Sequence, residues 1–157
     1  MRARAVKTRI GPLIVVLGAG LWFALELCLA QAPNCTRDDF ATVVEQSAGA
    51  LRKMNAENTP KFQSKLRALK EKRQWTHEQF LKQAAPFVQD DKILAFDSET
   101  NALLNKIESL GQGGDEAKPD CGVLEDLRGH MVSLVRTTQA KWAYMNTKID
   151  QGLWAPN

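Results

Sequence analysis

Mainly apolar residues recur at the spacing of an α-helix along most of the chain. This pattern restricts the fold more than any other feature of the sequence. From about residue 90 to 110 the steps alternate between three and four residues, which places the side chains on one face of an α-helix. This stripe consists of Ile93, Phe96, Thr100, Leu103, Ile107 and Leu110. No segment shows the sustained polar and apolar alternation of a half-buried β-strand. The sequence therefore predicts an all-α fold.

Helix start and stop signals divide the chain after residue 35 into five helical segments. Pro60 is suited to the first turn of a helix, and Thr76 and Asp120 are suited to N-cap positions. Gly111 and Gly152 are placed as helix stops. The expected helices span about 36–54, 60–75, 76–89, 90–110 and 120–152. We therefore expect residues 31–157 to form a single helical domain, a bundle of four or five helices.

The N-terminal residues 1–30 have the composition of a secretory leader. Four basic residues occur before residue 10, and residues 10–25 are apolar apart from glycine and proline. Ala30 completes a small-residue cleavage site before Gln31. Residues 10–30 are also about long enough to cross a membrane, so the leader is either a cleaved signal peptide or an anchor helix. The sequence predicts a periplasmic or secreted protein, or one anchored by this segment.

Export changes how the cysteines are interpreted. Cys28 belongs to the leader, which leaves Cys35 and Cys121 as the pair in the mature chain. A disulfide is the default in an oxidising compartment, and two buried thiols or a metal pair are the alternatives. Both cysteines precede an expected helix, so the bond would place the starts of these two helices at one end of the bundle. An up-and-down bundle then needs an odd number of helices between them.

The excess positive charge of the chain lies in the leader. The sequence has 21 Lys and Arg and 18 Asp and Glu, of which residues 31–157 contain 17 of each sign. The basic isoelectric point is therefore no argument for nucleic-acid binding, and we expect no nucleic-acid partner.

Charge is distributed unevenly within the mature chain. Residues 52–73 have a net charge of +6, and residues 76–126 have a net charge of −7. Either the basic helix lies near acidic neighbours within one fold, or it presents a face to an anionic partner. Two tryptophans at helix ends are either lids over the bundle or partner contacts. The candidate binding residues are Lys61, Lys65, Arg67, Lys70, Lys72, Arg73, Trp75 and Trp154.

Motifs for catalysis or metal binding are absent from the sequence. The two histidines, His77 and His130, belong to no pair at metal-ligand spacing. No Cys-x-x-Cys-His, Gly-x-Ser-x-Gly or phosphate-binding glycine loop occurs. Met54 with His130 is the one conceivable pair of haem ligands.

These features together predict an exported, non-enzymatic helical protein without a cofactor. It would bind or scaffold a cell-envelope component, and the expected partners are an envelope protein, a membrane surface or an anionic polymer. The alternative is a small bundle enzyme, or a redox or haem carrier of the periplasm.

Overall fold

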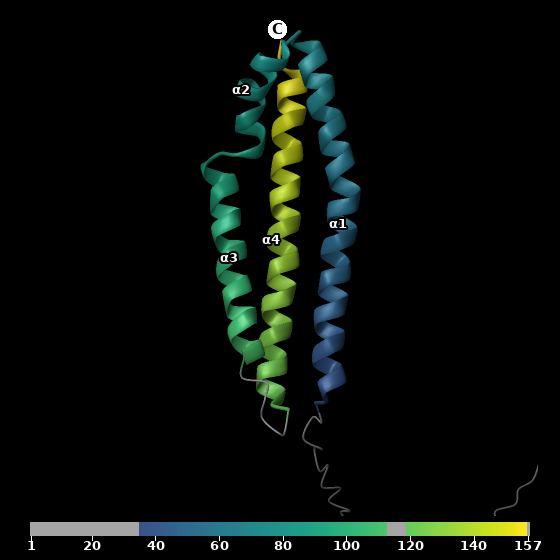
Figure 1. The fold of residues 1–157 in the computed structure, drawn as a ribbon, viewed down its shortest axis with the longest axis vertical. Coiled ribbons are helices and arrows are strands. Elements are labelled where there is room, and N and C mark those ends of the chain that lie inside the picture. Colours follow the sequence, from purple (N-terminus) through teal and green to yellow (C-terminus); the bar gives the residue numbers. More distant parts are fainter. Residues whose placement is uncertain (1–34, 113–118, 157) are drawn as a thin grey trace, which may run out of the picture. The chain divides into compact units, whose positions relative to one another are not determined.

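The computed structural model describes residues 35–112 and 119–156, and the regular secondary structure in these ranges is α-helical (Figure 1). The helices are α1 (Arg37–Lys72), α2 (His77–Val88), α3 (Asp91–Gln112) and α4 (Cys121–Trp154). The predicted all-α bundle is confirmed for this part of the chain, with four helices. The expected leader, residues 1–30, lies outside the described residues.

The first helix, α1, runs without interruption through Pro60, so the prediction of two helices, 36–54 and 60–75, was wrong. A proline inside a helix removes one hydrogen bond and costs about 3 kcal/mol. Both halves of α1 nevertheless bury apolar side chains, with Val43 before the proline and Phe62 and Leu69 after it. Each buried side chain of this size contributes about 1.5–3 kcal/mol. Packing of both halves therefore outweighs the lost hydrogen bond.

The two longest helices, α1 and α4, run parallel in a nearly constant register. The indole N–H of Trp142 donates to Asn55 Oδ1 at 2.9 Å, across a sequence separation of 87 residues. Two to three turns further on, Lys65 binds Asp150 at 2.8 Å, across a separation of 85 residues. A nearly constant separation along both helices requires that they lie side by side and point in the same direction.

A disulfide between Cys35 and Cys121 joins the starts of these helices, with the Cα atoms 5.3 Å apart. This confirms the expected cysteine pair and the expected placement of two helix starts at one end. Both helices begin at a capping residue. The Thr36 side chain accepts from a backbone N–H of α1 in a capping box, and Asp120 accepts from the N–H of Gly122 at 2.7 Å.

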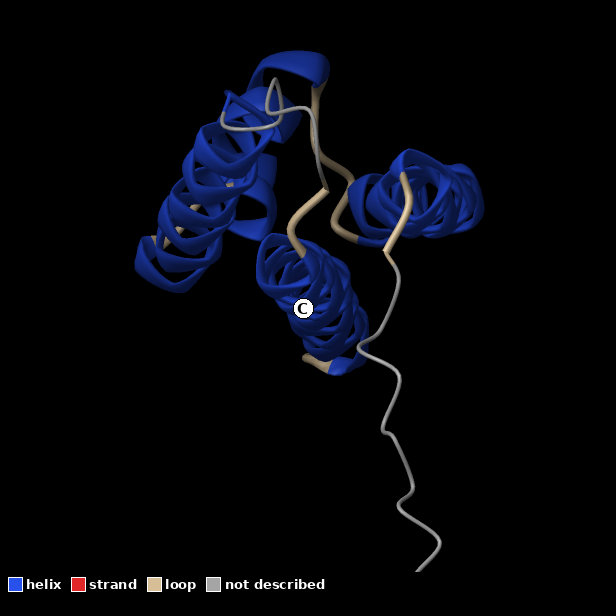
Figure 2. Cartoon of the chain, turned by 90° about the horizontal axis from the view of Figure 1, so that it is seen from below, coloured by secondary structure: helices blue, strands red, loops and turns tan. Residues whose placement is uncertain are grey.

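The short helix α2 and the helix α3 follow one another along the same side of α4 and form a single return pass (Figure 1). In the described part of the chain, two helices lie between the disulfide-linked helices, and not the odd number expected for a strict up-and-down bundle. Because α2 and α3 together make one pass, the starts of α1 and α4 still meet at one end. Viewed from the end, α4 lies between α1 and this return pass (Figure 2). Within the described residues, α4 has the most extensive contacts with α1 and α3 and smaller ones with α2.

Helix α4 contributes side chains to both apolar clusters of the core. The cluster near the disulfide contains Val43, Leu124, Leu127 and Met131. The cluster toward the opposite end contains Phe62, Leu69, Ile93, Met145 and Ile149. Because α1 and α3 bury their apolar faces mainly against α4, this helix organises the fold.

Glycine positions did not mark the helix ends. Helix α3 extends one residue past Gly111, and α4 continues past Gly152. At Gly152 a Cβ atom would lie 3.0 Å from Cζ of Phe87 in α2. The glycine therefore allows α2 to approach α4 closely, and its position in the sequence was misinterpreted as a stop.

The junction between α2 and α3 is fixed to α4 through Asp90. One carboxylate oxygen accepts the N–H of Ile93 at 2.8 Å, which caps α3. The other accepts the Tyr144 hydroxyl at 2.8 Å and also pairs with Lys148. The bonds from Lys148 and Ile93 lower the pKa of Asp90 to about 2. The hydrogen bond to Asp90 raises the pKa of Tyr144, so the hydroxyl remains a donor.

We expect the junction to make stability depend on acid pH. The pKa of Asp90 falls from 3.8 unfolded to about 2 folded, so its ionised form stabilises the fold above about pH 4. That contribution is lost as the pH falls from about 4 to 2. Asp90→Asn should be less stable than wild type near neutral pH and should lose less stability on acidification. Urea unfolding near neutral pH and at about pH 2 measures the two free energies of unfolding. Asp91→Asn is the control and should keep the wild-type pH dependence.

The disulfide should contribute much of the net stability. Closing a loop of 86 residues stabilises the fold by up to about 4.6 kcal/mol in the chain-entropy model. The double variant Cys35→Ser and Cys121→Ser should lose free energy of unfolding up to this amount in urea titrations. Wild-type protein in excess dithiothreitol should fall to the same value. Equal stability of the variant and the oxidised wild type would contradict the expectation.

Candidate functional site

Two predicted binding residues, Lys72 and Arg73, contact the C-terminal end of α4. Lys72 Nζ donates to the carbonyl of Ala155 at 3.0 Å. Arg73 donates to the carbonyls of Gly152 at 3.1 Å and Pro156 at 2.7 Å. Helix α4 has no basic residue in its own last turn, so these cations satisfy its free carbonyls and its negative dipole end. Their contacts fasten α1 to α4 opposite the disulfide.

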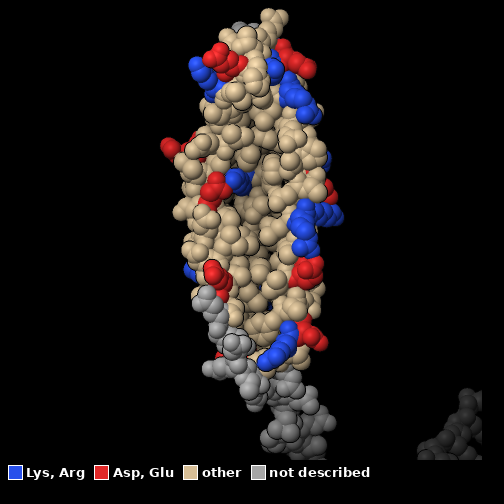
Figure 3. Space-filling view, viewed as in Figure 1, with Lys and Arg blue, Asp and Glu red and all other residues tan. Residues whose placement is uncertain are grey.

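Of the other predicted basic residues, two contact another side chain and two are exposed without an ion pair in the described part of the chain. Lys65 pairs with Asp150 at 2.8 Å, and the Lys70 ammonium lies 5.7 Å from the centroid of the Phe80 ring. Lys61 and Arg67 are exposed, and in the described part of the chain neither makes an ion pair. The face seen in Figure 3 shows basic and acidic side chains interspersed, without a large patch of one sign.

The acidic residues that follow α1 pair with α4 and not with the basic segment. Asp97 binds Lys141 of α4, and Asp90 binds Lys148 of the same helix. Among the described residues, no ion pair joins residues 52–73 to residues 76–126. Within the described residues, the basic and acidic segments therefore do not neutralise each other through direct ion pairs.

The two helix-end tryptophans occupy different environments. Trp75 is partly buried and packs against the apolar cluster that contains Leu69 and Ile149. Trp154 is 86% exposed at the end of α4. Trp75 thus acts as a lid over the bundle, whereas Trp154 is free to contact a partner.

The conceivable haem pair is not brought together. Met54 lies on α1 in a group of residues that includes Gln139 of α4. His130 precedes Gln139 by nine residues, which corresponds to about 13 Å along the helix. In residues 35–112 and 119–156, no cluster of three His, Cys, Asp or Glu side chains is placed to hold a metal ion. Within the same residues, no helix is both long and apolar enough to span a membrane.

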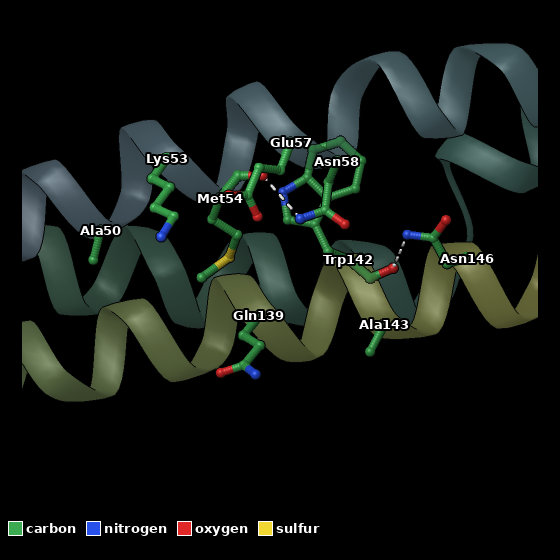
Figure 4. Close-up of a pocket in the computed structure, with 9 residues that line it drawn as sticks. All are labelled: Ala50, Lys53, Met54, Glu57, Asn58, Gln139, Trp142, Ala143 and Asn146. Carbon is green, nitrogen blue, oxygen red and sulfur yellow. Dashed lines mark hydrogen bonds between the residues drawn. The ribbon is translucent and has the colours of Figure 1, made fainter.

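An open groove of about 440 Å³ lies between α1 and α4 (Figure 4). One wall is α1 and the other is α4. The residues that line the groove are Ala50, Lys53, Met54, Glu57, Asn58, Gln139, Trp142, Ala143 and Asn146.

Two asparagines lie in the seam, the line of contact between α1 and α4, where the groove is located. Asn58 lies four residues from both Met54 and Phe62 on α1, and Asn146 lies four residues after Trp142 on α4. Each amide NH₂ donates to the backbone carbonyl four residues earlier, at 2.8 Å in α1 and 2.9 Å in α4. These bonds leave both amide oxygens as free acceptor positions on the groove (Figure 4).

The charged residues of the groove were missed in the sequence. Lys53 and Glu57 are exposed and line the same wall, and neither forms an ion pair within the part of the chain that the structure describes. The available signal was asparagine at Asn58 and Asn146, where the helical stripe calls for apolar residues. Such positions are polar interruptions of a helix seam.

Filling the seam should stabilise the bundle. We expect Asn58→Leu with Asn146→Leu to raise the free energy of unfolding by about 1–2 kcal/mol in total, because apolar surface replaces polar groups between the helices. Urea unfolding measures the change. Asn105→Leu on the exposed surface of α3 is the matched control and should change stability by less than about 0.5 kcal/mol. A less stable double variant would contradict the expectation.

Comparisons with known proteins assign no family to the chain. No family model, curated protein or solved structure matches it.

Proposed function

We propose that the protein is an exported, non-enzymatic helical protein that binds a cell-envelope component in the groove between α1 and α4. The disulfide between Cys35 and Cys121 supports an oxidising compartment, because such bonds persist outside the cytoplasm. The composition of residues 1–30 also supports export, because a basic segment followed by an apolar one is typical of a secretory leader.

The observation that carries the proposal is a seam fixed at both ends and open in the middle. The disulfide fastens α1 to α4 at their starts, and Lys72 and Arg73 fasten them at their ends. Between these points, Asn58 and Asn146 replace apolar contacts with polar groups. A groove with fixed walls binds its ligand with little loss of conformational entropy. It is thus suited to recognition.

The residues of the groove also favour binding over catalysis. Its lining contains Lys53 and Glu57, side-chain types that can act as bases or nucleophiles, but both are exposed, whereas catalytic groups are usually activated by burial or by a neighbouring base. The rival binding surface consists of Lys61 and Arg67, the exposed cations of the predicted basic face. That surface would take an anionic polymer or a membrane surface, and the experiment below separates it from the groove.

The test follows the indole N–H resonance of Trp142 by NMR, assigned through Trp142→Phe. Three probes are added to the purified protein: soluble peptide and glycan fragments of the cell envelope, dextran sulfate, and equimolar phosphatidylglycerol and phosphatidylcholine vesicles. Two variants are compared with wild type, Asn58→Leu with Asn146→Leu, and Lys61→Gln with Arg67→Gln.

We expect the envelope fragments to shift the Trp142 resonance in wild type and in the lysine and arginine variant, but not in the asparagine variant. Salt-sensitive binding of dextran sulfate or vesicles that needs Lys61 and Arg67 would overturn the groove as the binding site. Conversion of the fragments to new products would overturn the non-enzymatic assignment.

A further inference from the structure

The middle of the groove combines one aromatic ring with two amides. The separation that relates α1 to α4 is 87 to 85 residues along the seam. In this register Asn58 of α1 lies opposite the stretch of α4 between Trp142 and Asn146. Trp142 is only partly buried, and all three side chains line the groove (Figure 4). The ring and the two amides therefore lie within about one helical turn of each other along the seam.

Each of the two amides can both donate and accept. One N–H of each NH₂ group donates to the backbone carbonyl four residues earlier. The second N–H and the amide oxygen of Asn58 and Asn146 have no other partner in the described part of the chain. A hydroxyl group also donates and accepts, so two neighbouring hydroxyls of a sugar ring can bond to the N–H and the oxygen of one amide. These amides therefore suit a ligand that carries several hydroxyls.

The indole of Trp142 contributes apolar surface to the groove. Its N–H already donates to Asn55 at 2.9 Å, so the carbon atoms of the ring remain for a ligand. Met54 and Ala143 add further apolar surface to the lining. A sugar ring presents C–H groups on its faces and hydroxyls at its edge. Its faces can pack on an aromatic ring while its edge bonds to the amides.

The charges of the groove favour neither an anion nor a cation. Among the described residues that line it, only Lys53 and Glu57 are charged. They lie four residues apart on α1 and form an ordinary helix pair of opposite sign. A charged ligand would meet one group of its own sign and would also lose water from its charge. A neutral ligand avoids both costs.

We propose that the groove binds a neutral glycan, with one sugar ring against the indole of Trp142 and its hydroxyls bonded to Asn58 and Asn146. The inference rests on the proposed binding function and names the ligand class of the same site. It is consistent with the expected compartment, because cell envelopes contain glycans. The charged residues Lys53 and Glu57 lie at the sides of this contact and do not select the ligand.

The experiment adds four neutral probes to the purified wild-type protein and follows them by NMR. Three are disaccharides: cellobiose, maltose and N,N′-diacetylchitobiose. The fourth is glucitol, which has the hydroxyls of a sugar but no closed ring. We expect saturation transfer from the protein to the ring C–H protons of at least one disaccharide. The same protons should shift upfield, because they lie over the face of the indole of Trp142. Glucitol should show neither effect.

Three variants assign the contacts. Asn58→Ala and Asn146→Ala should each weaken disaccharide binding about fivefold, because each removes a neutral hydrogen-bonding group. Trp142→Leu should abolish the upfield shift, because leucine has no aromatic ring. The matched controls are Asn105→Ala on the exposed surface of α3 and Trp154→Leu at the exposed end of α4. Both controls should behave like wild type.

Failure of all three disaccharides to bind the wild-type protein would overturn the proposal. Equal signals from glucitol, or binding without an upfield shift, would also overturn it, because the sugar ring would then not lie on the indole. If peptide fragments of the envelope still shift the Trp142 resonance in that case, the binding function stands and only the ligand class is wrong. If no envelope fragment shifts it, the proposed function fails as well.

Discussion

The parallel pairing of α1 and α4 is the constraint on which the other features depend. Parallel helices place both positive dipole ends together and both negative ends together, which is unfavourable without compensation. At the start, Asp39 completes the capping box of α1, and its hydrogen bonds to Thr36 lower the pKa of its carboxyl group. At the end, Lys72 and Arg73 of α1 bind the carbonyls that α4 leaves free. The disulfide adds a covalent tie to these electrostatic contacts.

The return pass is fastened to this pair through α4. Asp90 caps α3 and at the same time binds Tyr144 and Lys148 of α4, so the turn between α2 and α3 is fixed in position. Further along α3, Asp97 pairs with Lys141. The residues that line the groove belong to α1 and α4, and none of them belongs to α3.

The two asparagines of the groove reduce the stability of the seam between α1 and α4. Asn58 and Asn146 occupy positions where leucine would bury more apolar surface and hold the helices together more strongly. Two polar groups at one level of a seam weaken local packing. The ties at both ends make this tolerable, because the helices cannot separate where the seam is open. Sites that bind ligands commonly retain polar groups at a cost in stability.

Features that depend on neighbouring residues could be read from the sequence. The stripe from Ile93 to Leu110 predicted a helix, and Thr76 and Asp120 cap helices as expected. The pairing of Cys35 with Cys121 spans 86 residues, and it could be predicted for a different reason, because these are the two cysteines that remain outside the expected leader. Other features depended on contacts between residues about 80 to 90 positions apart, which helical periodicity does not encode. Because both halves of α1 pack on α4, α1 continues through Pro60 as one helix. Lys72 and Arg73 donate hydrogen bonds to carbonyls at the end of α4, so they are not part of an open binding face. The groove likewise depends on the register of α1 and α4, which brings Asn58 and Asn146 to a similar level of one seam.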